Sequence, residues 1–173
     1  MNIVIREEQP SDILDIYLVE KEAFQRTDEA DLVNKLRENN AIFLSLVATV
    51  NDKIVGHALY SLVTVGDDNP QSSFPALGPI AVTPEFQGKG IGSALIQAGT
   101  QAIKKLGFGY VFLVGHPSYY PRFGFQPAIP LGFNSPYVVE GEAHDHFMVL
   151  VLDEKVLKTV NGMVHYRSEF NGL

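Results

Sequence analysis

The chain has 173 residues, enough for one domain that buries about two-thirds of the surface exposed by its unfolded chain. It contains no cysteine, which excludes disulfides, thiolate metal sites and a cysteine acyl-enzyme. A formal net charge of -7 argues against a non-specific nucleic-acid binder, which needs a basic face, and favours an amine-bearing partner.

The sequence also bears on cellular location. No apolar run approaches the roughly 18 residues of a membrane span, and the first residues lack a basic segment followed by an apolar core. The absence of cysteine suits a reducing compartment. We therefore expect a cytoplasmic protein with no membrane partner.

The first part of the chain combines a strand pattern with two helical patterns. Residues 2–7 alternate like a strand, and Ser11 offers an N-cap to a helix that reaches Phe24. A second helix is expected from about Asp28 to Glu38.

Strand patterns dominate the next segment. Residues 42–50 and 54–65 are rich in β-branched side chains and are joined by 51–53, which predicts a hairpin. Residues 66–75 collect Gly, Asp, Asn, Pro and Ser, so we expect a loop there, followed by a strand at 76–82.

The second half of the chain begins with a long helical pattern. Apolar spacing predicts a helix over 90–106 that ends at Gly107. The fully apolar run 110–114 predicts a central strand, a short helical or turn segment is expected around 118–122, and a last strand at 147–152. Together these elements predict an α+β fold.

A glycine-rich turn joins the strand expected to end at Val82 to the long helix. Its sequence is Gln87-Gly88-Lys89-Gly90-Ile91-Gly92. A turn of this kind at a helix start presents free backbone N–H groups, and the helix dipole adds positive potential, so it forms a phosphate site. Glycine allows a bulky pyrophosphate to approach the main chain. The predicted ligand therefore carries phosphate, unless the glycines serve only a tight turn.

The glycine spacing separates possible nucleotide motifs. A dinucleotide fingerprint needs G-x-G-x-x-G with an acidic residue about 20 residues further on. Here the spacing is G-x-G-x-G, and the later position is Tyr110 or Val111. No Gly-Lys-Ser/Thr triplet occurs, so the P-loop pattern is absent too. A dinucleotide-binding oxidoreductase is therefore disfavoured.

The strand before the turn carries a second signal, Gly78-Pro79. Proline removes a ladder donor and glycine weakens pairing, so this strand should bulge or part from its neighbour. The exposed backbone groups could pair with an extended amide-bearing arm such as pantetheine, in the manner of an added strand.

Three segments together resemble the GNAT superfamily of acyl-CoA-dependent N-acetyltransferases. Gln87, Gly90 and Gly92 fit its Gln/Arg-x-x-Gly-x-Gly/Ala signature, and residues 78–86 resemble its fourth strand and exit turn. Residues 119–125, Tyr-Tyr-Pro-Arg-Phe-Gly-Phe, resemble its Tyr-x-x-x-Gly-Phe segment. This last block is similar to that of an uncharacterised bacterial subgroup.

The resemblance implies one domain over residues 1–173, with a core of about 3–152 and a C-terminal tail of 153–173. It implies a mixed, mostly antiparallel central sheet, splayed between strands 4 and 5 and flanked by helices. Asn161-Gly162 is a turn signal in the tail, and we expect the tail to cover an edge rather than form a domain.

The resemblance also implies the ligand and the reaction. Acetyl-CoA would be the co-substrate, no metal would be needed, and the acceptor would be a small-molecule or peptide amine. The acetyl carbonyl would lie on main-chain N–H groups of Ile80, Ala81 and Val82. Tyr120 would protonate the departing thiolate as general acid. The remaining cofactor-binding residues would be Gln87, Gly88, Lys89, Gly90, Ile91, Gly92 and Ser93.

Several assignments stay open at this level. The general base could be Glu20, Glu22, Glu85 or no side chain. Tyr120 could instead be a packing residue with a bonded hydroxyl, the role we assign to Tyr119. Many family members have an asparagine where this chain has Leu113, so the helix carrying Tyr120 is expected to be short or distorted. Lys89 and Arg122 could bind phosphate or be solvated surface charges.

The histidines and the partner remain the least specified features. His144 and His146 alternate along the approach to a strand, and we interpret them as a structural pair rather than a metal site. Acceptor specificity is expected from residues 24–37, 65–74 and 128–140. The oligomeric state is open, a homodimer included. The rival hypothesis is a non-catalytic acyl-CoA-binding sensor or interaction module, which would lack working acid chemistry at Tyr120.

Overall fold

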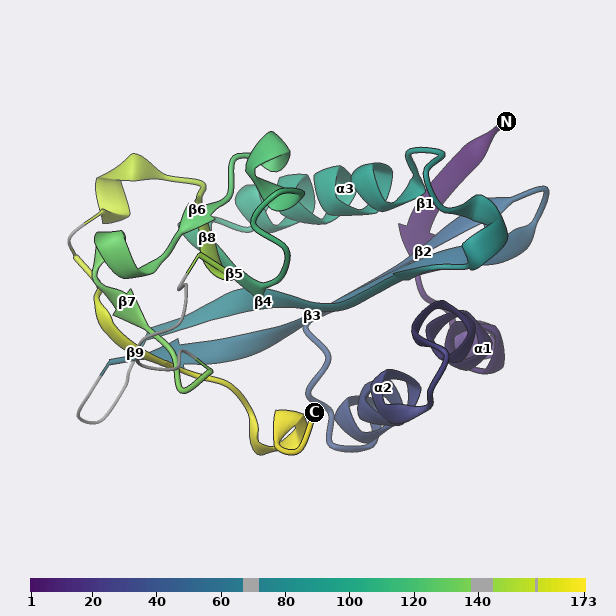
Figure 1. Cartoon of the computed structure of the whole chain (residues 1–173), viewed down its shortest axis with the longest axis horizontal. Helices are drawn as coiled ribbons and strands as arrows, with labels where there is room; N and C mark the ends of the chain where they lie inside the picture. Colours follow the sequence, from purple (N-terminus) through teal and green to yellow (C-terminus); the bar gives the residue numbers. More distant parts are fainter. Residues whose placement is uncertain (67–71, 138–144, 158) are drawn as a thin grey trace. The chain divides into compact units, whose positions relative to one another are not determined.

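The computed structural model describes residues 1–66, 72–137, 145–157 and 159–173. Within them, the strands follow the order β1-β2-β3-β4-β5-β8-β6, and β9 pairs with both β3 and β7 (Figure 1). The helices are α1 (Ile13–Phe24), α2 (Asp28–Glu38) and α3 (Ile91–Lys105), and the strands are β1 (Ile3–Glu7), β2 (Leu44–Val50), β3 (Lys53–Val65), β4 (Ser72–Val82), β5 (Tyr110–Val114), β6 (Gln126–Pro127), β7 (Phe133–Asn134), β8 (Phe147–Val151) and β9 (Gly162–His165).

Most neighbouring strands of this sheet are antiparallel, whereas β4 and β5 are parallel. This arrangement confirms the predicted mixed α+β fold. No helix in the described ranges is both long and apolar enough to cross a membrane. The chain divides into two compact units, unit 1 (Met1–Ser61, Gly78–Gln101 and Ser168–Leu173) and unit 2 (Leu62–Leu77 and Ala102–Arg167).

A two-residue turn fixes the β2–β3 hairpin of unit 1. Asn51 and Asp52 have φ angles of 49° and 62°, and Val50 pairs with Lys53 across the turn. Two consecutive left-handed residues match the natural twist of the flanking strands, and Asn and Asp tolerate this conformation well. The predicted hairpin is confirmed, with β2 starting at Leu44 and β3 at Lys53.

Helices cover both faces of the sheet in unit 1. Leu59 and Ala81 share a hydrophobic cluster with apolar side chains of α1 and α2. On the opposite face, the space beside Gly56 is filled by Ile91 and Leu95 of α3. Figure 1 shows α1 and α2 on one side of β2 and β3, and α3 on the other. The strand that leads into the glycine-rich turn is therefore held between helical layers.

The N-cap prediction for the first helix was wrong. Ser11 lies exposed inside a 3-10 turn (Pro10–Asp12), and Asp12 is the N-cap of α1. The Asp12 carboxylate accepts hydrogen bonds from the Gln9 backbone N–H at 2.7 Å and from Arg6 at 2.6 and 3.1 Å. These contacts stabilise the tight turn before the helix, and so they displace the helix start beyond Ser11. The second helix spans the predicted residues, Asp28–Glu38.

Unit 2 is built around β5, which was predicted to be central. Residues 110–113 are buried, and β5 pairs with β4 on one side and β8 on the other. Tyr110 and Phe112 contact Phe133 edge-on, with ring centroids 5.1 and 4.9 Å apart. The strand is apolar on both faces because both faces are covered.

The sequence predicted a loop over residues 66–75, and its predicted end was too late in the chain. Residues 67–71 lie outside the described residues, but β4 begins at Ser72. Phe74 contacts Tyr110 and Phe112 edge-on at 5.2 and 6.2 Å. Burial of this aromatic side chain outweighs the local turn composition, because strand formation depends on packing more than on propensity.

The C-terminal tail supplies the strand β9. In unit 2, Val164 and His165 of β9 pair with Val65 and Thr64 of β3. Residues 168–173 belong to unit 1, where Asn39 donates a 2.9 Å hydrogen bond to Glu169. The turn expected at Asn161-Gly162 was wrong: Gly162 is the first residue of β9 and has a φ angle of 110°.

Candidate functional site

The pairing of β4 changes along its length. In the described part of the chain, its ladder with β5 consists of Ala76 opposite Phe112 and Leu77 opposite Leu113. β4 then continues from Gly78 to Val82, and the Gly78–Pro79 peptide bond is cis. The predicted loss of pairing between strands 4 and 5 is confirmed, and it starts at the Gly-Pro step.

The glycine-rich turn follows β4 after a single 3-10 turn (Pro84–Phe86). Gly88 and Gly90 have φ angles of 73° and 84°, a left-handed conformation that favours glycine. A Cβ atom at either position would meet nothing within 4 Å, so the backbone conformation rather than crowding requires glycine. The space beside the turn is open to a ligand.

Helix α3 starts immediately after this turn. Ala94 N donates to Gly90 O at 3.0 Å, whereas the N–H groups of Ile91, Gly92 and Ser93 precede the first residues that can bond within the helix. Lys89 is exposed, with its ammonium 5.1 Å from the Phe86 ring centroid. Open N–H groups, the helix dipole and one lysine together favour an anion here.

A side-chain hydrogen bond ties the turn to the strand. Gln87 Nε2 donates to the carbonyl oxygen of Val82 at 2.9 Å, and Thr83 N donates to Val55 O at 2.9 Å. Ile80 and Val82 are half-buried, whereas Ala81 is buried. Residues 80–82 and 87–93 thus lie on one continuous segment of unit 1.

Tyr120 lies in unit 2, at the start of a single 3-10 turn (Tyr120–Phe123). The short helical segment expected from the sequence is therefore confirmed. The Tyr120 ring packs edge-on against Tyr119 and Phe125, with ring centroids 5.1 and 6.0 Å apart. A Cβ atom on Gly115 would overlap the Tyr120 ring. The glycine at 115 thus makes room for the tyrosine ring.

Burial tunes the acidity of this tyrosine. Desolvation, with a smaller contribution from Tyr119, raises the pKa of Tyr120 to about 12. The hydroxyl is therefore protonated at neutral pH and can donate a hydrogen bond or a proton. Tyr119 contacts Phe123 at 5.4 Å and the Arg122 guanidinium at 4.6 Å, which fits the packing role expected for it.

The remaining candidates are spread over both units. In unit 2, the rings of His116 and His146 are 6.5 Å apart, and His144 lies outside the described residues. The described ranges contain no group of three side chains suited to a metal. Among the candidate bases, Glu22 and Glu85 are exposed, whereas Glu20 is buried.

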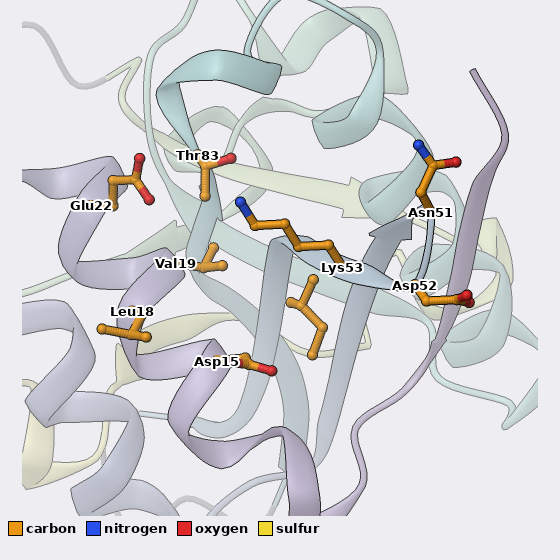
Figure 2. Close-up of a pocket in the computed structure, with 9 residues that line it drawn as sticks. Asp15, Leu18, Val19, Glu22, Asn51, Asp52, Lys53 and Thr83 are labelled. Carbon is orange, nitrogen blue, oxygen red and sulfur yellow. The ribbon is translucent and has the colours of Figure 1, made fainter.

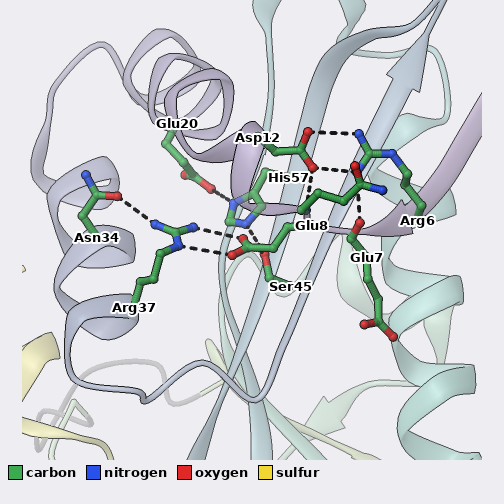
Figure 3. A network of polar contacts seen from close by, with 10 residues as sticks. Arg6, Glu7, Glu8, Asp12, Glu20, Asn34, Arg37, Ser45 and His57 are labelled. Atoms are coloured by element: carbon green, nitrogen blue, oxygen red, sulfur yellow. Dashed lines mark hydrogen bonds and ion pairs between the residues drawn. The ribbon is translucent and has the colours of Figure 1, made fainter.

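A buried polar network around His57 was not predicted (Figure 3). His57 Nδ1 is 2.5 Å from Glu20 Oε1, and its Nε2 is 2.9 Å from Ser45 Oγ. The Ser45 hydroxyl donates to Glu8, whose carboxylate accepts hydrogen bonds from Arg37 at 3.0 and 3.2 Å. The network therefore links a buried carboxylate on α1 to an ion pair near the surface of unit 1.

The donor pattern fixes where the protons lie. Because the single Ser45 hydrogen goes to Glu8, His57 Nε2 must donate to Ser45, and one proton is shared between His57 Nδ1 and Glu20. Burial raises the pKa of Glu20, although His57 opposes this shift. The raised pKa of Glu20 means that the contribution of this carboxyl group to folding declines as the pH rises.

The signal that could have revealed this pair is a polar residue inside an apolar pattern. Glu20 follows Ile16 and Val19 on the buried side of α1, and His57 is a polar residue within the buried run of β3. From the sequence, Glu20 was interpreted only as a candidate base. The contact between Glu20 and His57 joins residues 37 apart in the chain, and only the packing of α1 on β3 brings them together.

Breaking this pair is expected to destabilise the fold strongly. His57→Phe should lower the free energy of unfolding by about 3–5 kcal/mol, because it leaves the Glu20 carboxylate buried without its partner. Adding Glu20→Leu should recover most of the loss, because two apolar side chains replace the pair. Urea unfolding at pH 7 measures both values.

A surface ion pair provides the control. Arg26 and Asp28 form an ion pair at 3.7 Å in which both side chains are more than half exposed, so Asp28→Asn should leave the urea midpoint nearly unchanged. If the double variant were no more stable than His57→Phe alone, the destabilisation would not come from an unpaired buried carboxylate.

Comparison with known proteins decides the family. Residues 10–125 match the acetyltransferase (GNAT) family. The chain belongs to the GNAT family. The uncharacterized N-acetyltransferase YjhQ of Escherichia coli (strain K12) is 41% identical over 135 residues, which are 76% of this chain and 75% of YjhQ.

Solved GNAT structures share the fold. The N-acetyltransferase YhbS from Escherichia coli, in complex with CoA, matches with a TM-score of 0.90 and 30% identity, over 99% of this chain and 93% of that one. A GNAT acetyltransferase from Brucella melitensis, in complex with acetyl-CoA, matches with a TM-score of 0.80 and 30% identity, over 98% and 99%. The predicted family and fold class are both confirmed.

Proposed function

We propose that this GNAT protein works as one domain that transfers the acetyl group of acetyl-CoA directly to a primary amine of a small molecule or peptide. The observation that carries the proposal is the end of β4. There a strand that has lost its β5 partner runs into a left-handed glycine turn at the start of α3. The CoA and acetyl-CoA complexes of related GNAT proteins support this ligand.

The two parts of this segment suit the two ends of the cofactor. The turn and first helical residues would hold the pyrophosphate through backbone N–H groups, with Lys89 adding charge. The stretch Ile80–Val82, which lies beyond the β4–β5 ladder, would pair with the pantetheine arm and hold the acetyl carbonyl. Gln87 would act through its bond to Val82, which fixes the turn relative to the strand.

The proposed chemistry uses no covalent enzyme intermediate. The amine nitrogen attacks the thioester carbonyl, main-chain N–H groups stabilise the oxyanion, and the C–S bond breaks as the C–N bond is completed. The amine loses one proton to a base, and the departing thiolate gains one from Tyr120. No cysteine is available to carry the acetyl group. We assign no side chain as the base, because Glu20 is already engaged with His57.

Ligand selectivity tests the proposal directly. We expect acetyl-CoA and CoA to bind in the micromolar range by calorimetry, whereas NAD and ATP should bind little, because neither carries the amide arm that this stretch of β4 would accept. Binding of NAD without binding of CoA would contradict the proposed site.

Catalysis needs a separate measurement. A screen of primary amines with acetyl-CoA, followed by free thiol release, should find acceptors that are turned over. If acetyl-CoA bound tightly but no amine in a broad screen were acetylated, the protein would be a sensor or interaction module instead.

A further inference from the structure

Unit 1 contains a second concave site, on the α1 side of the β2–β3 hairpin (Figure 2). The pocket has a volume of about 490 Å³, which lies in the range of small-molecule sites. It is lined by Asp15, Leu18, Val19, Glu22, Asn51, Asp52, Lys53, Ile54 and Thr83. Helix α1, the hairpin turn and the end of β4 therefore all contribute to it.

The charged side chains give the pocket a negative balance. The lining includes three carboxylates, Asp15, Glu22 and Asp52, and a single cation, Lys53, whose side chain extends toward Thr83 in Figure 2. Across the described residues, none of these four groups forms an ion pair within 4.0 Å. A positively charged ligand would thus meet carboxylates that are not already neutralised.

The rest of the lining suits hydrocarbon. Val19 and Ile54 are buried beneath the pocket, and the Leu18 side chain is 50% exposed although it is apolar. Covering Leu18 with an aliphatic chain would remove its apolar surface from water. The pocket therefore combines apolar contacts with excess negative charge.

Thr83 adds a polar group to the pocket wall. The residue is 6% exposed, and its backbone N–H donates to Val55 O at 2.9 Å. Its hydroxyl group can act as a donor and as an acceptor at the edge of the pocket.

We propose that this pocket binds an aliphatic ammonium group of the amine acceptor. This group is a second amine of the acceptor and not the one that is acetylated. The inference rests on the proposed acetyl transfer, because acceptor amines of that reaction are ammonium ions at neutral pH. Thr83 follows Ile80 by three residues, about 10 Å along an extended strand. An acceptor anchored in the pocket must therefore carry its reacting amine on a long aliphatic arm.

The binding test uses the whole protein without acetyl-CoA. By calorimetry, 1,8-diaminooctane should bind and octanoate should not. Asp15→Asn with Asp52→Asn should weaken diamine binding by about two- to thirtyfold, since two exposed ion pairs are lost. Both residues are exposed, so the fold should be unaffected. Lys53→Met should strengthen binding because it removes a competing cation.

A matched control and a kinetic readout separate this proposal from acetyl transfer itself. Glu38→Gln removes one exposed carboxylate outside the pocket and should leave diamine binding unchanged. Asp15→Asn with Asp52→Asn should raise KM for the diamine with little effect on KM for n-butylamine or on acetyl-CoA affinity. Unchanged diamine binding in that variant would overturn the pocket proposal even if amines were acetylated. Pocket-dependent binding without any acetylation would instead contradict the proposed function.

Discussion

Replacing Tyr120 with phenylalanine is expected to lower turnover by about ten- to a thousandfold, the scale of losing one general acid. Coenzyme A leaves as a thiolate, and a phenol whose pKa is raised to about 12 stays protonated and can supply the proton. Acetyl-CoA affinity should change little, because the ring contacts with Phe125 and Gly115 remain. Single-turnover kinetics and calorimetry measure the two quantities.

Tyr119→Phe is the matched control for this experiment. It removes the neighbouring hydroxyl but keeps the ring that packs on Tyr120, Phe123 and Arg122. Its turnover should stay near that of the unmodified protein. If Tyr120→Phe also kept full turnover while chemistry limited the rate, Tyr120 would be a packing residue.

Gly90→Asp should weaken CoA binding by at least about a hundredfold. A carboxylate at this position would occupy the N–H groups at the start of α3 and repel the phosphates. Losing two charge-assisted hydrogen bonds, each about 1.5 kcal/mol or more, corresponds to that factor. The fold should survive, because a Cβ atom on Gly90 meets nothing within 4 Å and aspartate tolerates the left-handed conformation.

Two controls separate charge, conformation and position. Gly90→Asn has the same shape without the charge, so it should bind CoA more tightly than Gly90→Asp. Gly107→Asp places the same carboxylate at a glycine with a φ angle of 88° and open surroundings, but at the far end of α3. It should retain CoA binding. An unchanged dissociation constant in folded Gly90→Asp would remove the argument for an anion site.

Features that depend on neighbouring residues could be predicted from the sequence. Asn51-Asp52 encodes its own hairpin turn, and Asp28–Glu38 carries a helical pattern that matches the structure. The glycine turn was also readable, because Gly88 and Gly90 supply the left-handed angles that the turn needs. Gly78-Pro79 marked the place where β4 loses its β5 partner, because proline cannot donate to a ladder.

Features that depend on distant contacts were decided by tertiary structure. β4 starts at Ser72 because Phe74 packs on Tyr110 and Phe112, although the local composition favours a loop. The raised pKa of Tyr120 likewise follows from burial, which no spacing encodes.

The sequence by itself determined the family, the order of most elements and the segment proposed to hold the cofactor, because each depends on backbone preferences within a few residues. Only the tertiary structure decided that Glu20 meets His57 and that Asp15, Asp52 and Thr83 line one pocket. These groups come from a helix, a hairpin and a strand end that are far apart in the chain. Their meeting depends on how the layers of unit 1 pack, and packing is a property of the whole core rather than of any local pattern.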